Sequence, residues 1–277
     1  MTTPDVRGSS EELGMLEVYG APFSTFTRTI TMALHHLQLP FVFRHHPPHS
    51  SEIKAHNPLG LVPVLVHRPN PLFSPKQTSH VALPQIVLYE SNAIRRYIDD
   101  ALSTIAHGKG NKVSELNPAL DSREPQALLK TAALRASVDQ IVSIASTTVF
   151  TALEARIIKV RQSLEQNKAD EATIGVAVEE AMEGGQLVLD LLEGFIKENQ
   201  QANGAHGDWF VGDDLSWADL YVYPILADLK SIPEGPKLLS KTPLVAKWVE
   251  RMEAAAPAKA TYAHTVPDMR KKQGAAQ

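Results

Sequence analysis

Hydrophobic residues in the first hundred positions form short runs that alternate between the period of a strand and the period of a helix. Short runs rich in Val, Leu, Ile, Phe and Tyr are typical of buried strands, and such runs occur at residues 15–20, 40–46, 62–68 and 86–90. Three helices are expected between and after them, at residues 25–38, 51–60 and 91–102. In the first of these, Ile30, Leu34 and Leu37 share one stripe, and Asn57-Pro58 and Gly60 stop the second.

The order of these elements predicts the fold of the first half. A strand–helix–strand–helix unit is followed by two strands and a helix, which combines a parallel crossover with a hairpin. We therefore expect an α/β domain in which helices pack on a mixed four-stranded sheet.

The second half shows only helical patterns, and an all-α domain is expected there. The predicted helices cover residues 126–167, 171–200, 216–230 and 243–255. The first is too long for one straight helix of a compact domain, so we expect it to bend or break. Ser216 and Asp219 form a capping box at the start of the third, with Leu215 and Leu220 as its hydrophobic staple.

The remaining segments separate or flank the two domains. We expect domains at residues 15–104 and 126–256, a disordered leader at 1–14, a linker at 105–125 and a mobile tail at 257–277. Residues 69–85 contain four prolines and form a loop that is unusually long for a hairpin.

Composition narrows the class of protein. The chain has 277 residues, a net charge of −4 and no basic stripe, so nucleic acid is not the expected partner. It has no cysteine, which excludes disulfides, thiolate metal sites and a protein thiol nucleophile. The polar start is no secretory signal, and no run approaches 18 apolar residues, so no membrane partner is expected. These features favour a cytoplasmic protein.

Two segments carry candidate chemistry. If the Val62–Pro63 bond is cis, the chain turns sharply and presents the backbone N–H and C=O of Val62 to an extended peptide. The alternative is an ordinary trans entry into a strand. Glu90 and Ser91 stand where a strand ends and a helix begins, so Ser91 and the free N–H groups suit a carboxylate while Glu90 suits an ammonium group. That pair describes a site for an α-amino acid moiety, and the alternative is a plain helix cap.

Together the motifs "NPLGLVPVL", "LYESNAI" and "FSTFTRT" resemble the glutathione S-transferase superfamily, with the last similar to the S-x-x-T-R motif of its serine-type, phi-like and fungal members. The resemblance implies a thioredoxin-like N-terminal domain and an all-helical C-terminal domain over about residues 15–255. It also implies a cis Pro63, the γ-glutamyl end of glutathione on Glu90 and Ser91, and the cysteinyl amides on Val62.

Ser24 aligns with the serine of S-x-x-T-R, so the resemblance implies that its hydroxyl donates to the sulfur of glutathione. Thr25 and Thr27 are rival donors, and the alternative is that Ser24 or Thr25 only caps the helix. For the glycine carboxylate of glutathione, His49 is the best candidate.

Two positions depart from the family pattern. Pro48 stands where a basic residue is usual, and Leu61 replaces a usual Gln or Lys beside Val62. The histidines at 45, 46 and 49 also suggest a metal site, but no fourth ligand is evident, and we expect no metal.

The resemblance implies an enzyme that uses glutathione as co-substrate and conjugates it to a hydrophobic electrophile, with glutathione-dependent peroxide reduction as a related activity. Phe23, Ser143, Thr147 and Phe150 are candidates for the electrophile pocket, or plain packing residues. A homodimer is implied, with Arg95 and Arg96 as candidate interface residues.

Two alternatives to an enzyme remain. "YESNAI" also resembles the transferase-like domain of translation elongation factor gamma subunits, which serves in complex assembly. The second alternative is a regulatory or ligand-binding homologue with a decayed glutathione site.

Overall fold

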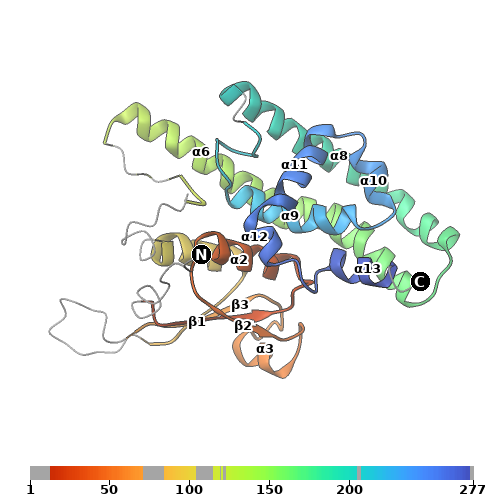
Figure 1. Ribbon diagram of the computed structural model, residues 1–277, viewed down its shortest axis with the longest axis horizontal. Helices are drawn as coiled ribbons and strands as arrows, with labels where there is room; N and C mark the ends of the chain where they lie inside the picture. The colour runs from red at the N-terminus through yellow and green to blue at the C-terminus, as the bar shows by residue number, and fades with distance from the viewer. Residues whose placement is uncertain are drawn as a thin grey trace, which may run out of the picture. The chain divides into compact units, whose positions relative to one another are not determined.

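The computed structural model describes residues 13–70, 84–103, 115–118, 120, 123–204 and 207–274, and the chain forms two compact units, Met1–Glu115 and Leu116–Gln277 (Figure 1). Most of the predicted leader, of the 69–85 loop and of the 105–125 linker lies outside the described residues. At the described end of the leader, Leu13 is already buried in the core of the first unit.

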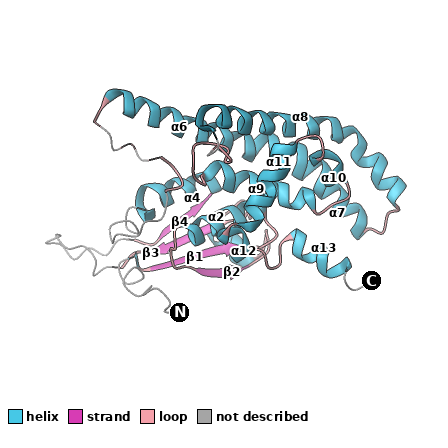
Figure 2. Cartoon of the chain, turned by 45° about the horizontal axis from the view of Figure 1, so that its top comes forward, coloured by secondary structure: helices cyan, strands magenta, loops and turns pink. Residues whose placement is uncertain are grey.

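The first unit is built on the mixed four-stranded sheet that the sequence predicts (Figure 2). Its strands are β1 (Met15–Gly20), β2 (Val42–His45), β3 (Val64–Arg68) and β4 (Ile86–Tyr89). They lie in the order β2-β1-β3-β4, with β1 and β2 parallel and the other neighbours antiparallel. This is the thioredoxin-like α/β arrangement.

Helices pack on this sheet. They are α2 (Thr25–His36), α3 (Ser51–His56) and α4 (Ser91–Tyr97), which continues directly into the π-helix η2 (Ile98–Leu102). Ile53 of α3 is buried against Val64 and Val66 of β3. On α2, the predicted stripe of Ile30 and Leu34 is fully buried.

The second unit is all-helical, as predicted. Its elements are α6 (Pro125–Ile144), π-helix η3 (Ala145–Ile158), α7 (Lys159–Gln166), α8 (Glu171–Asn203), α9 (Trp217–Lys230), α10 (Glu234–Leu239), α11 (Pro243–Ala254), α12 (Ala256–Ala260) and α13 (Val266–Gly274). Of the bend or break expected in the first long helix, the break does not occur. The chain stays helical from Pro125 to Gln166 and changes its hydrogen-bond register in η3 instead.

The run Pro125–Gln166 is also long and apolar enough, by length and composition alone, to cross a membrane, contrary to the expectation from the sequence. Its apolar side chains pack in the protein core: Val149, Leu153 and Ile157 are fully buried where η3 contacts α8 and α9. A core helix of a soluble protein passes the same test, so this helix is weak evidence for a membrane.

The predicted capping box at the start of α9 is present. One oxygen of Asp219, Oδ2, accepts from the backbone N and the Oγ of Ser216, both at 2.9 Å, and Oδ1 accepts from Trp248 Nε1 at 2.9 Å. Asp219 is fully buried, and this burial raises the pKa of its carboxyl despite these hydrogen bonds. The box therefore ties α9 to α11.

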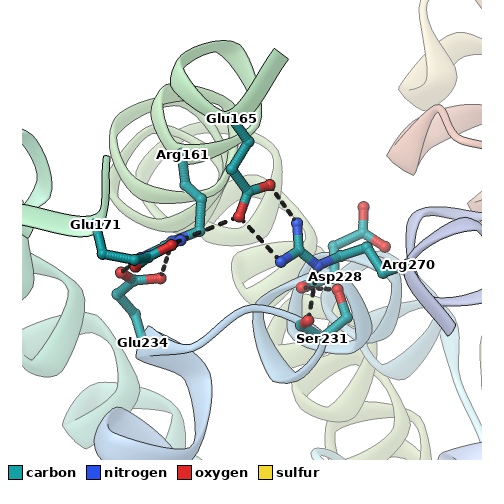
Figure 3. Close-up of polar contacts among 7 residues, drawn as sticks. All are labelled: Arg161, Glu165, Glu171, Asp228, Ser231, Glu234 and Arg270. Carbon is teal, nitrogen blue, oxygen red and sulfur yellow. Dashed lines mark hydrogen bonds and ion pairs between the residues drawn. The ribbon is translucent and has the colours of Figure 1, made fainter. Parts of the chain in front are cut away.

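Where a mobile tail is expected after Pro257, the described residues form α12 and α13. Pro257 itself stands in the first turn of α12, a position that favours proline. Arg270 of α13 donates to the backbone O of Ser231 at 2.9 Å and to both carboxylate oxygens of Glu165 (Figure 3). Polar contacts hold α13 in place. Its sequence therefore shows no hydrophobic periodicity from which the helix could be predicted.

Candidate functional site

The register of the sheet brings the predicted site segments to one edge. Val64, at the start of β3, pairs with Tyr19 near the end of β1 and with Tyr89 at the end of β4. Because both pairings are antiparallel, residues just before Val64 lie beside those just after Tyr19 and Tyr89. Val62–Pro63, the turn before α2, and Glu90–Ser91 therefore gather at the same edge of the first unit.

Ser24 is the N-cap of α2 at this edge. Its backbone is extended, with φ −81° and ψ 120°, and its half-buried Oγ accepts the backbone N–H of Thr27 at 3.4 Å. A hydroxyl that accepts in a cap keeps its own proton for donation. The first turn of α2 carries no acidic residue, so the positive end of the helix dipole is not neutralised there. Ser24 can thus cap the helix and donate to an anion at the same time.

The two rival hydroxyls are less accessible. Thr25 and Thr27 are buried, and neither Oγ1 has a hydrogen-bond partner among the described residues. The Thr27 side chain lies against Gly20, where an added Cβ would be only 2.5 Å from Oγ1. Thr27 is fully buried and cannot reach a ligand at the edge, whereas Thr25 keeps a small exposed fraction.

The Val62–Pro63 bond is cis, as the first of the two alternatives predicts. Among the described residues, no backbone hydrogen bond to Val62 is formed. Asn57, expected from the sequence only to end a helix, fixes this turn: its Nδ2 donates to the O of Leu61 at 2.9 Å and its Oδ1 accepts from the N of Leu59 at 3.0 Å. Asn57 is buried, and its spacing in the sequence does not mark this role. The Leu61 side chain is 48% exposed and apolar.

Glu90 has an unusual backbone, with φ 68° and ψ 114°. A non-glycine residue in a sparsely populated region costs about 1–3 kcal/mol and is found most often at ligand sites. Its side chain is exposed and makes no cap hydrogen bond to α4. Ser91, the first residue of α4, is half-buried beside it. The carboxylate is therefore free to receive an ammonium group.

His49 lies on the loop that precedes α3 and is exposed. It also has a positive φ of 65°, and its N donates to the O of Gly60 at 2.7 Å. A Cβ on Gly60 would be 2.5 Å from His49 Nδ1, so only glycine fits beneath this ring. This packing joins the His49 loop to the turn that leads into Val62.

The histidines do not assemble a metal site within the described residues, where no three His, Asp or Glu side chains converge. The His46 ring instead stacks on Tyr19, with centroids 5.8 Å apart, and its Nδ1 lies 3.7 Å from Glu52 Oε2. His45 is exposed near the end of β2.

The electrophile-pocket candidates divide between the two units. Phe23 belongs to the first unit and is 40% exposed. Ser143 and Thr147 are exposed on the α6–η3 helix of the second unit, where Thr147 Oγ1 donates to the O of Ser143 at 2.7 Å. The half-buried Phe150 ring carries Lys159 Nζ at 4.6 Å from its centroid. These four residues remain candidates.

Comparisons with known proteins agree with this architecture. The family profile described as "Glutathione S-transferase, N-terminal domain" matches residues 23–101, and "Glutathione S-transferase, C-terminal domain" matches residues 150–256. Together they match about two thirds of the chain. No curated protein sequence matches it significantly.

Solved structures share the fold at low sequence identity. Glutathione transferase F7 from Populus trichocarpa is 22% identical, with a TM-score of 0.60, and the match covers 90% of this chain and 98% of that one. Glutathione S-transferase-I bound with lactoylglutathione is 20% identical, with a TM-score of 0.60 and coverages of 91% and 100%. FzlA from C. crescentus is 18% identical, with a TM-score of 0.61 and coverages of 89% and 91%. At these identities the structures show the fold alone. With both family profiles matching in order, one on each unit, the chain belongs to the glutathione S-transferase superfamily.

Proposed function

We propose that the protein is a serine-type glutathione transferase in which Ser24 donates a hydrogen bond to the sulfur of glutathione. The observation that carries this proposal is the gathering of three features at one sheet edge. These are the Ser24 hydroxyl at a helix N-terminus, the backbone of Val62 before a cis proline, and the exposed Glu90 carboxylate. Each suits a different part of one tripeptide.

The tripeptide would lie extended along the edge. Its γ-glutamyl ammonium group would bind Glu90, and its γ-glutamyl carboxylate would bind Ser91 and the first N–H groups of α4. The cysteinyl amides would pair with the backbone of Val62 as an added strand. His49 would receive the glycine carboxylate. Leu61 can offer no polar side chain, so we expect weaker binding than a site with a donor there would give.

Ser24 would act by stabilising the thiolate. A thiol with an ordinary pKa near 8.5 is only a few per cent ionised at pH 7. Lowering that pKa by about two units corresponds to about 2.7 kcal/mol and makes the thiolate the main species. A donated O–H bond and the positive end of α2 can supply this differential stabilisation.

The thiolate sulfur would then attack an electrophilic carbon of a small hydrophobic molecule, forming a carbon–sulfur bond as a leaving group such as halide departs with its electron pair. Phe23, Ser143, Thr147 and Phe150 are the proposed contacts for that molecule. Organic hydroperoxides are a second class of substrate to test. We place the enzyme in the cytoplasm, as a homodimer that uses Arg95 and Arg96 at its interface.

Two measurements on the wild type and Ser24→Ala test the proposal. Titration calorimetry measures the binding of glutathione, and ultraviolet absorbance detects the bound thiolate. We expect both proteins to bind glutathione and only the wild type to show the thiolate. Conjugation of an aryl halide should fall in Ser24→Ala by about 10²-fold or more, because a donor at a developing or resting anion contributes on that scale.

Thr25→Val is the matched control, since it removes the neighbouring hydroxyl at the same helix end. A thiolate signal lost in Thr25→Val and kept in Ser24→Ala would transfer the role to Thr25. Absence of glutathione binding by the wild type would refute the transferase proposal and favour an assembly role.

A further inference from the structure

One face of α8, the helix labelled in Figure 2, carries exposed apolar side chains that the fold of the second unit does not use. Val176, Leu187 and Leu191 are 74%, 71% and 42% exposed. Leu187 and Leu191 are one turn apart, and Val176 lies three turns before Leu187, so all three share one face. The opposite face packs inward through Ile174, Val178, Leu189, Leu192 and Ile196.

Glycines distinguish the two faces further. The inward Gly185 is required by packing, since an added Cβ would be 2.8 Å from Ile157 Cδ1. The outward Gly184 and Gly194 flank the leucine pair, and a Cβ on either would have no described atom within 4 Å. Each outward glycine costs the helix about 1 kcal/mol relative to alanine. The fold of the unit gives no reason for them, whereas a second backbone could approach closely there.

The charges on this face are all of one sign. Glu180, Glu183 and Glu198 are exposed and stand at helical spacing from Leu187. None of them forms an ion pair with another described residue. Lys197 of α8 is exposed too, but it lies about 80° around the helix axis from Leu187, so the charged residues nearest to the apolar stripe are acidic.

This pattern discriminates between occupants. In an antiparallel pairing of two copies centred on Leu187 and Leu191, Glu180 of each copy would lie opposite Glu198 of the other. Two like-charge contacts would result, which disfavours this α8-to-α8 pairing of two copies. A helix with leucine-sized residues at i and i+4 can pack on the apolar stripe, and Lys or Arg beside those residues can pair with the glutamates.

We propose that the outward face of α8, comprising Val176, Glu180, Glu183, Leu187, Leu191 and Glu198, docks a basic amphipathic helix of another protein. The face lies within the second unit and involves none of the residues proposed for glutathione. Docking and transferase activity can therefore be tested independently.

The probe is a fluorescein-labelled synthetic peptide with leucines at i and i+4 and lysines beside them, and the reference is a scrambled peptide of the same composition. Fluorescence anisotropy with the full chain should show binding of the amphipathic peptide only, and added salt should weaken it. Leu187→Ser/Leu191→Ser and Glu180→Lys/Glu183→Lys should each weaken binding about tenfold or more.

Two variants serve as matched controls. Leu129→Ser removes an equally exposed leucine, 70% exposed on α6, and Asp213→Lys/Asp214→Lys reverses two exposed charges before α9. Both should leave binding unchanged. Equal binding of the two peptides, or equal loss in the controls, would overturn the proposal. Sedimentation tests the remaining alternative, which is self-association of the chain. If the chain self-associates, Leu187→Ser/Leu191→Ser abolishes this and the peptide does not compete with it, the face binds a second copy instead.

Discussion

Arg161 donates two parallel hydrogen bonds to Glu234, from Nε to Oε2 and from Nη2 to Oε1, both 2.7 Å long (Figure 3). The two residues are 73 positions apart, and both side chains are buried. The same guanidinium donates to both oxygens of Glu171 and to Glu165. One arginine thus joins α7, the start of α8 and the start of α10.

Arg161→Ala should lower the free energy of unfolding by about 3–5 kcal/mol, because it leaves the buried Glu234 carboxylate without its partner. Glu171→Ala is the matched control. The Glu171 side chain is 73% exposed, and solvent screening weakens its ion pair, so a much smaller loss of stability is expected. Urea unfolding of the three proteins measures both changes. Equal losses in the two variants would show that burial does not govern the strength of this cluster.

Arg270→Ala should release α13. Bonding to Arg270 is the largest influence on Glu165 and, with the bond to Arg161, lowers the pKa of that carboxyl despite partial burial. A lowered pKa in the folded state means that the contact stabilises fully above the ordinary Glu pKa of about 4.3 and is lost as the pH falls through the folded value.

We therefore expect the amides of residues 266–274 to exchange hydrogen faster in Arg270→Ala than in the wild type at neutral pH. In the wild type, we expect this exchange to become faster only in acid. Lys271→Ala, which removes the next cation of α13 and no ion pair within the described chain, should exchange as the wild type does. Unchanged protection in Arg270→Ala would show that other contacts hold the helix.

The buried hydroxyl of Thr27 gives a prediction of the opposite sign. Its Oγ1 has no described partner, so Thr27→Val removes an unsatisfied polar atom and keeps the shape of the side chain. The free energy of unfolding should be unchanged or rise by up to about 2 kcal/mol. Thr29 is the control, since its equally buried Oγ1 donates to the O of Thr25 at 3.1 Å and Thr29→Val should cost about 1 kcal/mol. A destabilised Thr27→Val would reveal a partner for this oxygen.

The sequence predicts the fold well where local patterns decide it. Alternating hydrophobic runs locate the four strands, and the Ser216–Asp219 spacing locates the start of α9. Long-range polar contacts leave no such pattern: α10 depends on Glu234 reaching Arg161, and α13 on Arg270 reaching Glu165. Both helices are accordingly missing from the expectations.

The candidate site follows the same division. "VP" before a strand and "ES" before a helix mark its segments, and the sheet register then places them at one edge. The support of the turn by Asn57 depends on a side chain folding back onto Leu61, which spacing alone does not show. The pocket for the electrophile depends on which side chains line it, and a structural neighbour with 22% identity shares the fold without defining that lining.

Glu90 offers a test in which stability and function should move in opposite directions. Its φ of 68° suits glycine, so Glu90→Gly should relieve backbone strain of about 1–3 kcal/mol. The greater freedom of glycine in the unfolded chain offsets about 0.5–1 kcal/mol of that gain. A net increase of about 1 kcal/mol in the free energy of unfolding is expected, together with loss of glutathione affinity because the partner of the ammonium group is gone.

Glu90→Gln separates the two effects, because it keeps the side-chain size and the strained backbone but removes the charge. We expect its stability to equal that of the wild type and its glutathione affinity to fall by about tenfold, since a hydrogen bond between charged groups contributes about 1.5–3 kcal/mol and the amide oxygen retains part of it. Thermal unfolding and calorimetry on the three proteins measure both quantities. If Glu90→Gly gained no stability, the positive φ would be a conformation that glutamate adopts there without cost. If both variants bound glutathione as the wild type does, the strained carboxylate would have no part in binding it.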